Sequence, residues 1–95
     1  MSQRDDYQKA YISTATTTQV LTGPGRLHAI VIGTAVDAVG DISIIDNTTG
    51  STVNVALLQA TTPSGTYIFD CRIHTGIRII TAGADKITVI YSDKG

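Results

Sequence analysis

The chain of 95 residues has no tryptophan, no glutamate and a single cysteine, Cys71. One cysteine cannot form an intramolecular disulfide, so a disulfide framework is excluded. A chain of this length forms one domain with a modest hydrophobic core. Small domains without disulfides or metals often gain buried surface by oligomerisation. The sequence therefore favours self-association.

Charge is scarce as well. Charged residues make up 16% of the chain and the formal net charge is −1, so nothing attracts a polyanion and no nucleic acid partner is expected. No apolar run approaches the roughly 20 residues of a membrane helix, so no membrane partner is expected. Residues 1–9 are polar and do not resemble a signal peptide, which predicts that assembly begins in the cytoplasm.

β-Branched residues dominate what is present. The chain contains 15 threonines, 13 isoleucines and 7 valines, against four leucines and one methionine. β-Branched side chains lose rotamer freedom in a helix and pack well on a pleated sheet. Without glutamate, the usual capping boxes and ion pairs of surface helices cannot be built with that residue. The composition predicts an all-β protein.

Turn residues divide the chain into about seven or eight expected strands. Gly23-Pro24-Gly25 predicts a reversal, because proline fixes φ and glycine accepts positive φ. This spacing predicts a single antiparallel β-sandwich over residues 10–95, preceded by a flexible polar arm at residues 1–9. The expected strands are residues 26–34, 41–46, 52–59, 66–74, 77–81 and 86–92, with one or two more within 10–22, and residues 46–50 form a hairpin-type connection.

Several expected strands are apolar on both sides. Leu27, Ala29 and Val31 alternate with Ile30 and Ile32 along one of them. The outer faces of an isolated two-layer sandwich are expected to be polar. Apolar outer faces need a second cover, which neighbouring subunits or a large assembly would supply.

No catalytic constellation is expected. His74 follows Cys71 by three positions, and side chains three apart on a strand point to opposite faces, so the two are not expected to share a proton. Cys71 lies on the apolar face of its strand, where a thiol behaves as a small hydrophobe. His28 and His74 lack the further ligands of a metal site. The prediction is a non-enzymatic protein with no catalytic residue, metal or cofactor.

One group of basic side chains is a candidate subunit or capsid interface. Its members share the same parity along their strands and would form one patch if those strands were neighbours. Either they are scattered solubilising charges, or they pair with Asp70 or Asp46 of a neighbouring subunit and fix its register. The five residues are Arg26, His28, Arg72, His74 and Arg78.

A family resemblance rests on turn motifs and strand pattern. The stretches that carry it are residues 20–28 (VLTGPGRLH), 41–50 (DISIIDNTTG), 65–67 (GTY), 74–77 (HTGI) and 81–91 (TAGADKITVIY). From about residue 15 to residue 91 the chain resembles small virion structural proteins of tailed bacteriophages. Similar proteins often carry Gly-Leu where Gly76-Ile77 stands here. The resemblance implies a jelly-roll-like sandwich, present in many copies as homotrimers on a particle, with no catalytic residue.

Within that group, a capsid decoration or cement protein is the expected function. Its partners would be itself, the major capsid protein and other virion proteins, and its location would be the virion, assembled in the host cytoplasm. The arm at residues 1–9 would lie over the capsid shell while the sandwich forms trimers through its apolar outer faces. A tail, neck or fibre component is an alternative with the same fold. A carbohydrate-binding host-attachment module would need Tyr67 or Tyr91 exposed at a pocket.

Overall fold

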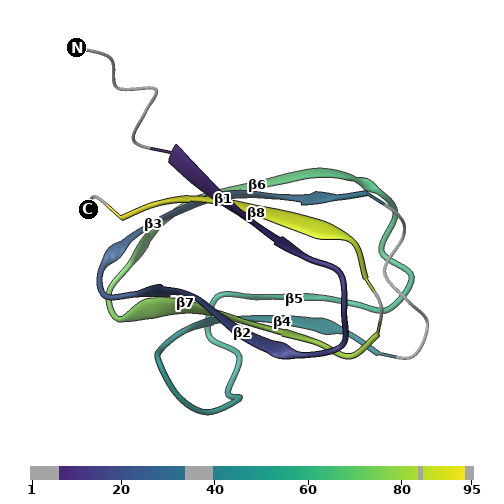
Figure 1. Ribbon diagram of the computed structural model, residues 1–95, viewed down its shortest axis with the longest axis horizontal. Coiled ribbons are helices and arrows are strands. Elements are labelled where there is room, and N and C mark those ends of the chain that lie inside the picture. Colours follow the sequence, from purple (N-terminus) through teal and green to yellow (C-terminus); the bar gives the residue numbers. More distant parts are fainter. Residues whose placement is uncertain (1–6, 34–39, 84, 94–95) are drawn as a thin grey trace.

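The computed structural model describes residues 7–33, 40–83 and 85–93. These residues form eight β-strands and no helix, arranged as two packed antiparallel sheets (Figure 1). The predicted all-β antiparallel sandwich is therefore confirmed. The strands are β1 (Tyr7–Ile12), β2 (Thr17–Thr22), β3 (Gly25–Ile32), β4 (Ile42–Asp46), β5 (Ala56–Leu58), β6 (Gly65–Ile73), β7 (Gly76–Thr81) and β8 (Ile87–Ser92).

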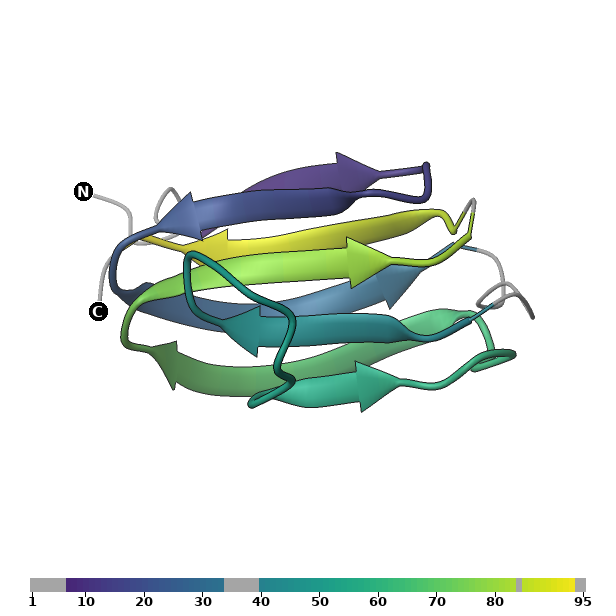
Figure 2. The same cartoon turned by 90° about the horizontal axis from the view of Figure 1, so that it is seen from below.

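The strand order is that of an eight-stranded jelly roll. One sheet, here called sheet A, has the order β1-β8-β3-β6, and the other, sheet B, has the order β2-β7-β4-β5. The chain changes sheet at almost every turn; only β4 and β5 follow each other within one sheet (Figure 2). The predicted reversal at Gly23-Pro24-Gly25 is one of these changes, because it carries the chain from β2 in sheet B to β3 in sheet A.

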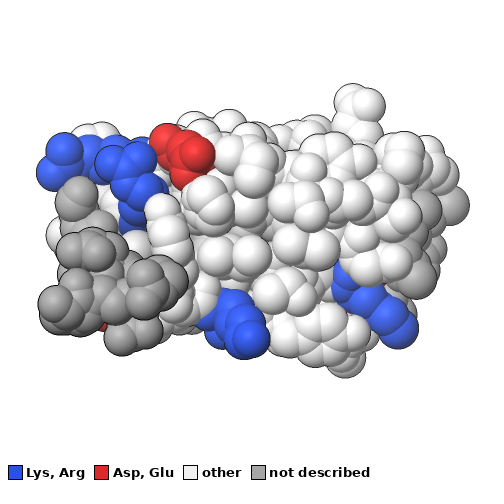
Figure 3. Space-filling model, turned by 90° about the horizontal axis from the view of Figure 1, so that it is seen from above, with Lys and Arg blue, Asp and Glu red and all other residues white. Residues whose placement is uncertain are grey.

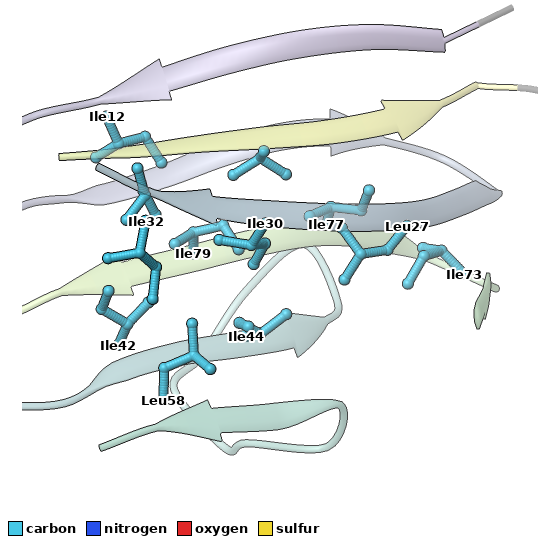
Figure 4. Packing of buried hydrophobic residues seen from close by; sticks show 12 residues of the cluster. Ile12, Leu27, Ile30, Ile32, Ile42, Ile44, Leu58, Ile73, Ile77 and Ile79 are labelled. Atoms are coloured by element: carbon cyan, nitrogen blue, oxygen red, sulfur yellow. The ribbon is translucent and has the colours of Figure 1, made fainter. Parts of the chain in front are cut away.

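Isoleucine fills the space between the sheets. Alternate positions of each strand point inward, so Ile42 and Ile44 of β4 meet the side chains of sheet A and are 0% exposed (Figure 4). Burying one such side chain contributes about 1.5–3 kcal/mol. The buried cluster consists of Ile12, Leu27, Ile30, Ile32, Ile42, Ile44, Leu58, Ile73, Ile77, Ile79, Ile87 and Val89.

A bulge in β3 changes which face its residues occupy. The pairing of β3 with both of its neighbours shifts between Leu27 and Ala29, so the core side chains are Leu27, Ile30 and Ile32. The predicted alternation had placed Ala29 on the same side as Leu27. Because both sides of this strand are apolar, its sequence pattern does not show where an extra residue lies.

The sandwich begins earlier than predicted. Strand β1 starts at Tyr7, and Lys9 lies opposite Ile90 of β8. Residues 7–9 therefore belong to the sheet and not to an arm, while residues 1–6 of the predicted arm lie outside the described residues. The polar sequence misleads here because β1 is an edge strand and mainly Ala10 and Ile12 contact the core.

The chain itself covers part of the outer face of sheet B. The predicted return strand at 52–59 shortens to β5, and residues 47–55 instead cross the outside of β4 and β7 (Figure 2). Ile45 points outward, opposite Arg78 of β7, yet it is only 1% exposed. The expectation that outer apolar residues need neighbouring subunits is therefore wrong for Ile45, which its own loop covers.

Candidate functional site

Two of the five predicted interface residues lie side by side on sheet A. Strands β3 and β6 are neighbours, and Arg26 is directly opposite Arg72. Both point away from the core, and Arg72 is exposed. Like charges directly opposite each other destabilise an antiparallel pair. The pair is therefore an unfavourable arrangement for the isolated sheet.

His28 finds its partner within the same chain. The register shift in β3 and the positive φ of 46° at Asp70 bring the two side chains together, with His28 Nδ1 2.5 Å from Asp70 Oδ1. Arg26 also donates to the Asp70 backbone carbonyl at 3.4 Å, and the Tyr7 ring lies 4.7 Å from the His28 ring. Pairing with Asp70 of a neighbouring subunit is one of the two alternatives for this group of basic residues, and in the structure Asp70 instead pairs with His28 of its own chain.

Asp46 is likewise engaged within the chain. Its carboxylate accepts hydrogen bonds from three successive backbone N–H groups of the β6–β7 turn: His74 at 2.9 Å, Thr75 at 2.8 Å and Gly76 at 3.2 Å. Partial burial alone would raise the pKa of Asp46, but these three hydrogen bonds and the nearby His74 together lower it below 3.8. Asp46 thus fixes the turn that presents His74.

Arg78 does not join the patch. It lies on β7 in sheet B, where its Nε donates to the Gly50 carbonyl at 2.9 Å and its Nη1 to Gln19 Oε1 at 3.0 Å. A longer contact of 3.4 Å reaches the Thr48 carbonyl. Parity along the strands placed Arg78 with Arg72, but β6 and β7 belong to different sheets. Its role is to hold the loop that covers Ile45.

We expect Arg78→Gln to lower the free energy of unfolding by about 1–2 kcal/mol, because two loop carbonyls and Gln19 lose their charged donor. Amide hydrogen exchange of residues 47–55 should become faster at the same time. Chemical denaturation and exchange mass spectrometry measure the two effects. Arg72→Gln is the matched control and should change stability by less than about 0.5 kcal/mol. Unchanged exchange in the loop would contradict this role.

A pocket of about 450 Å³ opens at the edge of the sandwich beneath β6. Cys71 is one of the residues that line this pocket. Partial burial raises the pKa of its thiol above 9.0, and the negative charge of Asp46 raises it further, so the thiol stays protonated at neutral pH. His74 lines the same pocket, contrary to the prediction of opposite faces, because β6 ends at Ile73 and His74 lies in the following turn. In the described part of the chain no hydrogen bond joins the two. The lining residues are Asp46, Asn54, Val55, Phe69, Cys71, Arg72 and His74.

The outer face of sheet A exposes several large apolar side chains. Tyr7, Tyr11 and Ile68 on this face are 46%, 64% and 58% exposed. Figure 3 shows the face with few charged side chains over its middle. One row of outward residues crosses all four strands: Lys9, Ile90, Ala29 and Ile68.

Sequence reasoning found only part of this surface. It did not single out Ile68, and it assigned Tyr7 to the arm. The signal that did point to an apolar outer face was the apolar character of both sides of β3, which marks the centre of a sheet whose outside is not fully solvated.

The two tyrosines named for carbohydrate binding are both half-buried. Tyr67 donates its hydroxyl hydrogen to the Pro63 carbonyl at 2.7 Å, and Tyr91 packs against the core. The tyrosines that are exposed are Tyr7 and Tyr11.

No family model, curated protein or solved structure matches the chain. Within residues 7–33, 40–83 and 85–93, no three His, Cys, Asp or Glu side chains gather as they would around a metal ion. The same residues include no helix able to cross a membrane. The two surfaces of the molecule that bear on its function are the outer face of sheet A and the pocket beneath β6.

Proposed function

We propose that the protein is a non-enzymatic structural subunit that works in a many-copy assembly, with the outer face of sheet A as the surface where copies meet. The observation that supports this is the difference between the two sheets. On sheet B the loop 47–55 buries the outward Ile45, whereas Tyr11 and Ile68 on sheet A remain more than half exposed. A monomer gains nothing from exposing them, while an assembly buries them.

The size and composition of this face fit an interface between protein subunits. The molecule measures 42 × 26 × 18 Å, and the outer face of sheet A spans the longest and the shortest of these dimensions (Figure 2). The face therefore presents roughly 750 Å², close to the ~800 Å² per partner of a standard interface. Apolar residues occupy the middle, and charges of both signs lie around them, from Lys9 on β1 to Asp70 and Arg72 on β6. Interfaces share this pattern of apolar centre and polar rim. A second copy of the same chain is the proposed occupant, since a rim with both signs can complement itself.

The sequence resemblance suggests the virion of a tailed bacteriophage as the assembly, and within the virion we propose the head. In that setting the protein would be a decoration or cement protein, bound as a homotrimer to the major capsid protein in the virion. Many copies acting together need only weak attachment each. The jelly roll alone does not select this function, because it also occurs in lectins and cupins. A tail, neck or fibre component would use the same face, and mass spectrometry of separated heads and tails distinguishes the two locations.

We expect Ile68→Asp to weaken self-association at least about 100-fold, because it places an unpaired charge in the middle of the apolar face. Native mass spectrometry and light scattering at micromolar concentration measure the oligomer. Leu57→Asp is the matched control, since Leu57 is 44% exposed but lies on β5 in sheet B, and this variant should keep the wild-type oligomer. A wild-type protein that stays monomeric at high concentration would remove the basis of the proposal.

A further inference from the structure

The edge of the sandwich is open because its two edge strands differ in length. Strand β6 has nine residues, whereas β5, at the same edge of sheet B, has three. The inward side chains of Phe69 and Cys71 are therefore only half-buried, while Leu27 on the neighbouring strand is 0% exposed. Together with Val55 they give the pocket an apolar lining. Its volume of about 450 Å³ lies within the usual range of small-ligand sites.

The Asp46 and Asn54 side chains of the pocket are already hydrogen-bonded within the chain. Three backbone N–H groups of the β6–β7 turn occupy the Asp46 carboxylate. The Asn54 side chain accepts from the Asp46 backbone N–H at 2.6 Å and donates to the Asp46 carbonyl at 3.2 Å. These two side chains form part of the pocket wall and have little remaining capacity to hydrogen-bond a ligand.

The remaining polar side chains at the rim, Arg72 and His74, can each donate hydrogen bonds. No described residue forms a hydrogen bond or ion pair with the Arg72 guanidinium or the His74 imidazole, and both side chains are exposed. Arg26 stands directly opposite Arg72 on β3. An anion held by Arg72 would reduce the repulsion within this pair. The pocket is therefore suited to an anionic group.

The lining favours one class of anion. Asp46 keeps its charge and would repel a doubly charged phosphate more strongly than a singly charged carboxylate. Phe69 and Val55 favour a ligand with an apolar part. We propose that this pocket binds a carboxylate carried on an aromatic or aliphatic group, with the carboxylate on Arg72 and the apolar group against Phe69 and Val55. Such a group is found in a free organic acid and at the C-terminal residue of a polypeptide. The proposal does not depend on the assembly face of sheet A.

The test is a titration of the isotope-labelled full chain, followed by NMR. The probes are phenylacetate, its neutral isostere phenylacetamide, and inorganic phosphate. Phenylacetate should shift the backbone amides of Val55, Phe69, Cys71 and Arg72 with a millimolar Kd, and phenylacetamide should bind at least about tenfold more weakly. Phosphate should bind more weakly than phenylacetate.

Two variants distinguish recognition of the ligand's charge from nonspecific binding. Arg72→Gln should weaken phenylacetate binding about tenfold while its spectrum stays that of a folded protein. Lys9→Gln is the matched control, because Lys9 is also an exposed cation on sheet A but lies on β1 at the opposite edge, and it should leave the Kd unchanged.

The source of the carboxylate is tested with the tripeptide Ala-Ala-Phe in its free-acid and amidated forms. Stronger binding of the free acid than of phenylacetate supports a polypeptide C-terminus, and the reverse order supports a small organic acid. Equal binding of phenylacetate and phenylacetamide, tighter binding of phosphate, equal binding by wild type and Arg72→Gln, or no shift at about 10 mM would each overturn the proposal.

Discussion

Replacing Gly25 with alanine is expected to lower the free energy of unfolding by about 3 kcal/mol or more. A Cβ atom at this position would lie 2.3 Å from the Ser92 carbonyl oxygen and 2.7 Å from Leu21 Cδ2. The oxygen cannot move away easily, because Ser92 is paired with both β1 and β3. Gly25 lies where the chain passes from sheet B to sheet A, so the clash opens the corner between the layers. The melting temperature should fall by roughly 15 °C.

The control for this prediction is Gly33→Ala. A Cβ atom at Gly33 meets nothing closer than the Lys86 carbonyl oxygen at 3.4 Å, which is an ordinary contact. Its stability should stay within about 0.5 kcal/mol of wild type. Gly25 is the first residue of β3 and Gly33 follows its last residue. Each variant replaces one glycine by alanine, so the entropy of the unfolded chain changes alike. Equal melting temperatures for the two variants would show that the corner is not tightly packed.

Removing the Asp46 side chain is the second large effect. We expect Asp46→Ala to lower the free energy of unfolding by about 2 kcal/mol, because the turn N–H groups of His74, Thr75 and Gly76 lose their charged acceptor. Water replaces part of these bonds, since the turn is exposed at His74 and Thr75. Equilibrium denaturation at neutral pH measures the change. The β6–β7 turn should also show faster amide exchange.

The Asp46 carboxylate also makes the free energy of unfolding depend on pH in the acidic range. The folded-state pKa of Asp46 lies below 3.8, so its stabilisation is complete above that value and is lost as the pH falls through the folded-state pKa. The stability difference between wild type and Asp46→Asn should therefore shrink below pH 3.8. Asn keeps the shape of the side chain and one acceptor oxygen, but its amide nitrogen cannot accept the hydrogen bond that the second carboxylate oxygen accepts, so the charge and one acceptor are lost together. A difference that stays constant from neutral pH to pH 2 would contradict the pKa direction.

The two surfaces of sheet A support different functions. Its outer face is apolar in the middle and has few charged side chains there, as an interface between subunits requires. Its β6 edge is hollow, with donors at the rim and an apolar lining, as a ligand site requires. Ile68 and Arg72 lie on the same face of β6 with Asp70 between them, so Ile68→Asp and Arg72→Gln each also serve as a control for the other.

Local sequence predicted the elements better than their partners. The turn predicted at Gly23-Pro24-Gly25 separates β2 from β3, and Cys71, placed on the apolar face of its strand, packs against the core from β6, as the structure confirms. Only part of the predicted patch of basic side chains forms in the structure. Arg26 and Arg72 do meet, but Arg78 holds a loop on the other sheet. Parity along a strand says which side a residue takes and nothing about which sheet the strand joins.

The sequence by itself determined that this is an all-β sandwich, because a chain rich in threonine, isoleucine and valine, without glutamate, has few ways to build helices. Only the tertiary structure decided the jelly-roll order, the face switch at His28, the intrachain partners of Asp46 and Asp70, and the loop that covers Ile45. Each of these depends on pairing between strands distant in the sequence. The free energy of such pairings lies in contacts that no local pattern of residues encodes.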